Sequence, residues 1–162
     1  MPYLLDSNIF IQAKNLHYGF DFCPAFWEWI VRENAGGTVF SIQKVRDELV
    51  AGADELADWA RAREDEFFLA PDGSVVPSLT ALSAWAGSGA YEPAAASEFL
   101  QAADYYLVAQ AHAKQFAVVT HEVPGNSPRR IKIPNACLEL GVRVLTPYEM
   151  LRAERARFVL GA

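Results

Sequence analysis

The chain has 162 residues, which is enough for one domain with a substantial core and too few for two of ordinary size. Its apolar fraction of 52% and charged fraction of 21% exclude a disordered or fibrous protein, and the net charge of -6 argues against broad electrostatic binding to nucleic acid. Cys23 and Cys137 lack any zinc-binding spacing, and no apolar run approaches the ~20 residues that span a bilayer. We expect no signal peptide, because the first residues lack a basic segment and reach an acid at Asp6. We expect one cytoplasmic domain over residues 1–162.

The first half of the chain alternates short apolar runs with helical patterns. A strand at 3–5 ends at Asp6, where a helix can start on a capping residue. Pro24 suits the first turn of a second helix, and residues 38–41 follow as a second strand. Apolar residues then recur at helical spacing from 42 to 68, and Gly52 bends or divides this segment.

The second half of the chain contains the clearest helical pattern in the sequence. Residues 70–93 are rich in Pro, Gly and Ser and predict a loop with a short helix at 79–85, whereas 94–114 predicts one continuous helix. Strands at 116–120 and 142–145 and a helix at 147–158 complete the chain. Strands separated by helices predict a three-layer α/β domain, with a parallel sheet of about four or five strands and helices on both faces. The functional crevice of such a sheet lies beyond the carboxyl ends of its strands.

Four acids stand out against this framework. Asp104 lies within the apolar stripe of its helix, where a carboxylate is costly unless it is paired or bound to metal. Asp6 and Glu122 follow the first and third predicted strands, and Glu48 borders the apolar face of the helix after the second. Each has an ordinary alternative: a helix cap for Asp6, a solvated charge for Glu48, a paired structural acid for Asp104 and loop polarity for Glu122.

The motifs around these acids occur in the order found in the PIN-domain family, which the chain resembles over nearly its whole length. They are Leu4-Leu5-Asp6-Ser7-Asn8, Ser41 followed by Glu48-Leu49, Ala103-Asp104, and Val118-Val119-Thr120-His121-Glu122. The segments 12–15 and 21–27 are similar to an uncharacterised PIN-like subfamily related to VapC toxins. The whole chain would then be a single PIN-like nuclease domain.

The resemblance implies an endoribonuclease that depends on Mg²⁺ or Mn²⁺ and acts as the toxin of a toxin–antitoxin pair. Asp6, Asp104 and Glu122 would bind metal, and Glu48 would be a further catalytic acid, directly or through water. Asn8 and Thr120 would orient these acids or a water. The candidate phosphate contacts, with a solvated charge run as the alternative, are Lys14, Arg129, Arg130 and Lys132.

Two positions depart from the family pattern. Glu122 stands where the family usually carries Asp, and Asn135 stands where the subfamily tends to carry an acid. These departures keep open a PIN fold without turnover that binds RNA or a protein partner. Asn8 argues against a haloacid-dehalogenase phosphatase, which needs a second Asp there, and the three histidines lack the spacing of a zinc hydrolase.

The resemblance also implies an antitoxin partner and a homodimer. Two helical segments, 26–30 and 148–158, carry more apolar residues than a small monomer easily covers. They favour the homodimer and leave a further surface for the antitoxin.

Overall fold

The computed structural model describes residues 1–161, and a parallel five-stranded sheet forms its centre. The strands occur in the order β3-β2-β1-β4-β5, so the order reverses direction between β1 and β4. Their bounds are β1 (Tyr3–Leu5), β2 (Val39–Ile42), β3 (Phe68–Leu69), β4 (Ala117–Val119) and β5 (Val144–Leu145). All strand pairs are parallel, so all five carboxyl ends lie along one edge of the sheet.

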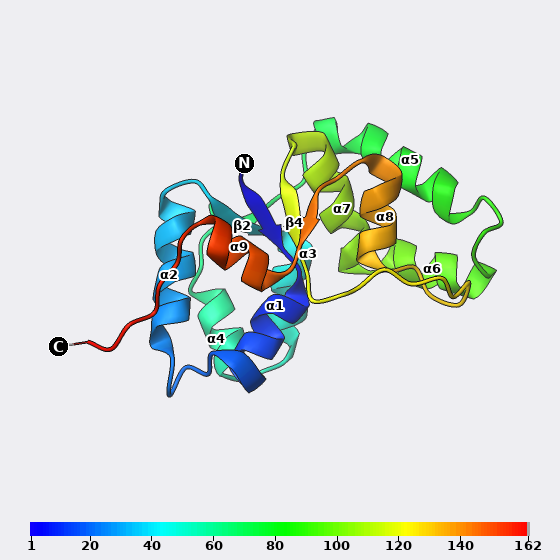
Figure 1. Ribbon diagram of the computed structural model, residues 1–162. Helices are drawn as coiled ribbons and strands as arrows, with labels where there is room; N and C mark the ends of the chain where they lie inside the picture. Colours follow the sequence, from blue (N-terminus) through cyan, green and yellow to red (C-terminus); the bar gives the residue numbers. More distant parts are fainter. Residues whose placement is uncertain (162) are drawn as a thin grey trace.

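Helices cover both faces of this sheet, which confirms the three-layer α/β fold (Figure 1). The segments before β3 are α1 (Ser7–Gln12), the π-helical turn η1 (Ala13–His17), α2 (Pro24–Ala35), α3 (Gln43–Ala51) and α4 (Glu55–Arg61). After β3 come the 3-10 turn η2 (Gly73–Val75), α5 (Val76–Ala86), α6 (Pro93–Gln101), α7 (Ala103–Lys114), α8 (Ile133–Leu140) and α9 (Pro147–Ala153). In Figure 1, α2 and α9 lie to one side of the sheet, and α5 to α8 lie to the other. Among residues 1–161, no helix is both long and apolar enough to cross a bilayer.

The central strands are apolar on both faces because both faces are covered. Every residue of β1 and β4 is buried, as expected for parallel strands between two layers of helices. This rigid centre fixes the residues that directly follow each strand.

The continuous helix expected over residues 94–114 is wrong. It is two helices, α6 and α7, separated at Ala102, whose backbone is extended (φ -89°, ψ 159°). No Gly or Pro lies at the break, so packing overrides local propensity there. The break puts Asp104 in the first turn of a new helix rather than in the middle of a long one.

Other element boundaries also differ from the sequence prediction. Gly52 does end α3, but residues 68–69 are the edge strand β3 rather than helix. The short helix expected at 79–85 extends over Val76–Ala86, and the closing helix ends at Ala153. Helix α8 was not predicted, although Pro134 in its first turn and Gly141 at its C-cap (φ 69°) are typical helix boundaries.

The apolar face of α2 is covered within the monomer. Phe26, Trp27, Trp29 and Ile30 are all buried in the core. The exposed apolar surface expected on this helix is therefore wrong, because the chain covers these side chains itself, and α2 gives no support for a homodimer.

Candidate carboxylate site

The site lies where the strand order reverses. The register pairs Leu5 of β1 with Val119 of β4, so the residues that follow, Asp6 and Thr120, leave the sheet side by side. The Asp6 backbone N–H extends this pairing by donating to the Val119 carbonyl at 2.9 Å. Ligand sites of open parallel sheets occur at such a reversal, beyond the carboxyl ends.

Asp6 is buried, with 3% of its surface exposed. It occupies the N-cap position of α1, yet its side chain makes no capping hydrogen bond, which contradicts the simple cap alternative. Its Oδ2 accepts a hydrogen bond from Thr120 Oγ1 at 2.8 Å, and its Oδ1 accepts one from Ser7 Oγ at 3.4 Å. The carboxylate is thus held from β4 rather than used to start the helix.

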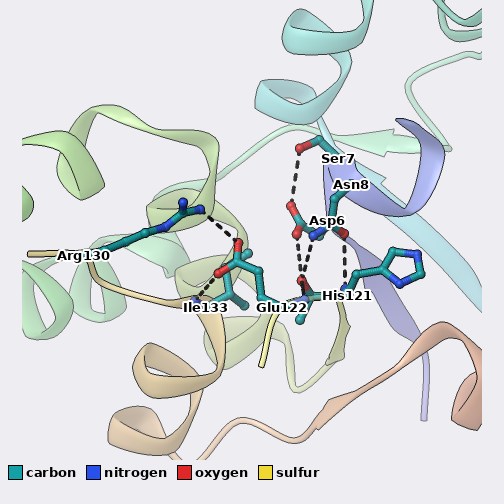
Figure 2. A network of polar contacts seen from close by, with 8 residues as sticks. Asp6, Ser7, Asn8, His121, Glu122, Arg130 and Ile133 are labelled. Atoms are coloured by element: carbon teal, nitrogen blue, oxygen red, sulfur yellow. Dashed lines mark hydrogen bonds and ion pairs between the residues drawn. The ribbon is translucent and has the colours of Figure 1, made fainter. Parts of the chain in front are cut away.

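Thr120 and Asn8, the two residues expected to orient the acids, join the ends of β1 and β4. Figure 2 shows Asn8 beside Asp6 and the backbone of His121. Asn8 Nδ2 donates to Thr120 Oγ1 at 3.3 Å, and Asn8 Oδ1 accepts from the His121 backbone N–H at 3.3 Å. The Glu122 backbone N–H also donates to Thr120 Oγ1, at 3.1 Å. One threonine hydroxyl therefore connects two of the four acids.

The charges of the neighbouring predicted acids raise the pKa of Asp104 and of Asp6. Burial, followed by the charges of Glu122 and Glu48, raises the pKa of Asp104 to about 6, and Arg130 partly opposes this rise. Burial and the charge of Asp104 raise the pKa of Asp6 to about 7, against the lowering effect of the Thr120 hydrogen bond. Asp104 begins α7 and the exposed Glu48 lies on α3, so the acids come from separate elements. Their charges are not fully compensated by the protein.

Glu122 has a second role at the start of α8. Its Oε1 accepts a hydrogen bond from the Ile133 backbone N–H at 3.1 Å, and its Oε2 lies 3.9 Å from Arg130 Nη2. Figure 2 shows its side chain directed toward these two partners. Like Asp6, it has a protein partner at each carboxylate oxygen.

The four predicted phosphate contacts have different surroundings. Within residues 1–161, Arg130 is the one with an ion pair to the acids. Lys14 pairs with Asp54 at 3.1 Å, and Arg129 lies 3.8 Å from Glu92. Lys132 precedes α8 as its N-cap residue.

Asn135 is tied to the loop before α8. Its Oδ1 accepts from the Gly125 backbone N–H at 3.0 Å, and its Nδ2 donates to the Gly125 carbonyl at 2.9 Å. An amide satisfies both backbone groups at once, which a carboxylate cannot do. Asn135 therefore has a structural function in this chain.

The acids suit a hydrated hard cation better than a closed metal centre. Within the described residues, no three His, Cys, Asp or Glu side chains are arranged to hold an ion directly. Mg²⁺ keeps several waters and is often bound through one or two carboxylates. Asp6 and Asp104, which repel each other, fit that mode of binding.

Sequence reasoning missed a cluster of three rings beside the acids. The rings of His17 and His121 have centroids 5.5 Å apart, and Tyr148 lies 5.9 Å from the first and 6.0 Å from the second. Burial and the neighbouring His17 lower the pKa of His121. Because the rings come from three distant segments, no local spacing in the sequence indicates the cluster.

The fold and the site together define a parallel α/β domain with incompletely compensated acids at the carboxyl edge of its sheet. The family model described as "Domain of unknown function (DUF4411)" matches residues 3–158, and the chain belongs to this family. Neither a curated protein nor a solved structure matches the chain. The relationship to PIN domains stays a prediction.

Proposed function

We propose that this chain is a metal-dependent endoribonuclease of the PIN type. The observation that supports this proposal is the convergence of Asp6 and Asp104, joined by Glu122 and Glu48, at the reversal of strand order. Structural acids are normally paired with cations, whereas burial and the neighbouring acids raise the pKa of Asp6 and of Asp104. Arg130 provides limited compensation from one side.

In this proposal, the acids bind a cation and Arg130 binds a phosphate. Asp6 Oδ2 is fixed by Thr120, which leaves Oδ1, with its longer contact to Ser7, as the freer oxygen for an ion or its water. Asp104 and Glu48 would contribute further negative charge, and Arg130 would contact a phosphate oxygen. Bound Mg²⁺ or Mn²⁺ would supply an activated water and would offset charge on the phosphate.

The wider role we propose is that of a toxin controlled by an antitoxin, acting in the cytoplasm as a homodimer. This part rests on the motif resemblance. Expression of the chain alone should arrest growth if it is right, and co-expression with the product of an adjacent regulator gene should relieve the arrest.

A cleavage assay with matched variants tests the nuclease proposal. Single-stranded and structured RNAs are incubated with purified protein and Mg²⁺ or Mn²⁺, with EDTA as the negative control. Wild-type protein and Asp65→Asn, which changes an exposed acid, should cut RNA, and Asp104→Asn should not. Absence of cleavage by the wild type with either ion contradicts the proposal, and cleavage by Asp104→Asn removes this residue from the site.

A second candidate is a PIN-like module that binds RNA or a protein without turnover. The contacts of Glu122 favour it, because both carboxylate oxygens already have protein partners. In that case, RNA anisotropy should show binding by wild-type protein, with no product at any ion concentration.

A further inference from the structure

The cluster of His17, His121 and Tyr148, called here the ring cluster, joins three elements at the edge of the site. His17 ends η1, His121 follows β4, and Tyr148 lies in the first turn of α9. Tyr148 Oη lies 3.3 Å from His17 Nε2. Tyr148 is 37% exposed and the two imidazoles are half-buried, so the cluster lies at the surface rather than in the core.

The ring cluster is attached to the carboxylate site through the backbone. His121 lies between Thr120 and Glu122, and its N–H is held by Asn8. Figure 2 shows the His121 ring on the side of the site opposite to Arg130. An extended ligand that runs from Arg130 across the acids would therefore reach the ring cluster next.

Two features distinguish the ring cluster from ordinary polar surface. Within residues 1–161 the His121 ring makes no hydrogen bond, although it is half-buried beside two other rings. His17 is placed by a π-helical turn, which is uncommon in proteins and often occurs at functional sites. The π-helical turn and the grouping of three rings from distant segments are independent observations, and together they support a binding role for the ring cluster.

We propose that the ring cluster binds an unpaired nucleobase of single-stranded RNA adjacent to the acids. This inference rests on the proposed function in taking RNA as the ligand. Flat rings stack on any base, and the imidazole nitrogens and the phenol hydroxyl can hydrogen-bond to its edge. Bases within a duplex are already stacked on their neighbours, so the ring cluster selects single strands.

A fluorescence experiment tests the ring cluster without requiring cleavage. The probe is a single-stranded oligoribonucleotide that contains 2-aminopurine, whose emission falls on stacking, and the protein is Asp104→Asn in EDTA. Binding should quench the probe, and Tyr148→Phe should retain the quenching. Tyr148→Leu and His17→Leu should each weaken binding by about tenfold, the loss expected for one stacked base. His112→Asn is the control, because His112 is an exposed histidine of α7 outside the ring cluster. The asparagine keeps a polar atom near the position of His112 Nδ1, which contacts Ser78 Oγ in the wild type.

The outcomes separate this inference from the nuclease proposal. Unchanged quenching and affinity in both leucine variants, or equal affinity for a duplex probe, would overturn the ring-cluster inference even if wild-type protein cuts RNA. Ring-dependent quenching in a protein that cuts nothing would keep the inference and reject the nuclease. In an active enzyme, Tyr148→Leu should raise KM more than it lowers kcat.

Discussion

The hydroxyl of Thr120 donates a 2.8 Å hydrogen bond to Oδ2 of Asp6, across 114 positions of the sequence. Both residues are buried, and each directly follows a central strand. The contact exists because β1 and β4 are parallel neighbours, and it fixes the orientation of a carboxylate that its own helix does not use as a cap. The geometry of Asp6 therefore depends on β4.

Thr120→Val should raise the pKa of Asp6 above its value of about 7, because the Thr120 hydrogen bond lowers it. The change keeps the side-chain shape but removes the oxygen that accepts hydrogen bonds from Asn8 Nδ2 and from the Glu122 N–H. We therefore also expect the free energy of unfolding to fall by about 1–3 kcal/mol. Carboxyl NMR titration and urea unfolding measure the two effects. Thr80→Val, at an exposed threonine of α5, is the control, and an unchanged pKa of Asp6 would contradict the prediction.

The stability of the metal-free protein should fall as the pH rises from 5 to 8. The pKa values of Asp6 and Asp104, about 7 and about 6 in the folded chain, exceed their ordinary value of 3.8, so the folded state binds these protons more tightly than the unfolded state. Their stabilising effect is complete below pH 3.8 and is lost as the pH rises through 6 and 7.

Asp104→Asn should therefore reduce the loss of stability between pH 5 and pH 8. Removing one of two repelling charges should make the apo protein more stable at pH 8 by on the order of 1–2 kcal/mol. Urea unfolding of the variant and the wild type at both pH values isolates this effect from that of His121, whose lowered pKa acts in the opposite direction. A lower stability at pH 8 would indicate instead that Asp104 is a structural acid paired to a cation.

Ser41→Ala should destabilise the protein by about 1–3 kcal/mol. Ser41 is fully buried on β2, and its Oγ donates to the Leu5 carbonyl at 2.6 Å, directly before Asp6. The alanine variant removes this hydrogen-bond donor, and no water reaches the buried Leu5 carbonyl to replace it. Ser88→Ala removes an exposed serine that donates to the Trp85 carbonyl, and it should have little effect in the same urea measurement.

Asn135→Asp should not restore a catalytic acid. The carboxylate would still accept from the Gly125 N–H but would face the Gly125 carbonyl without a donor, which should cost about 1–2 kcal/mol. Hydrogen exchange of residues 123–132 should increase, whereas Asn126→Asp, at an exposed position of the same loop, should leave it unchanged. Increased RNA cleavage by Asn135→Asp would show that position 135 belongs to the site after all.

The sequence allowed the layers, the parallel sheet and the central strands to be predicted because their signals are local. Tyr3–Leu5 and Ala117–Val119 lie in short apolar runs that end at a polar residue, and Pro24 begins a helix as expected. The break at Ala102 and the edge strand at Phe68 were not predictable in this way, because tertiary packing determines both.

The candidate site was predictable to the extent that its residues follow strands. Asp6 and Thr120 are such residues, and the structure brings them into contact. The contacts of Glu122 with Arg130 and Ile133, and the place of Tyr148 beside His121, depend on how distant segments pack. Spacing along the chain does not contain that information.

The loop between Glu122 and Ile133 is fixed at three places by contacts to its backbone or at its ends. Asn135 holds Gly125, the Pro128 carbonyl accepts from the Glu92 N–H at 2.8 Å, and Glu122 receives the N–H of Ile133. Ser127 Oγ also accepts the Arg129 N–H at 3.2 Å, whereas the exposed Val123 and Asn126 side chains make no hydrogen bond within residues 1–161. Substitutions at positions such as 123 and 126 should therefore leave the loop and the acids beneath it in place, so the loop can change what it recognises without moving the site.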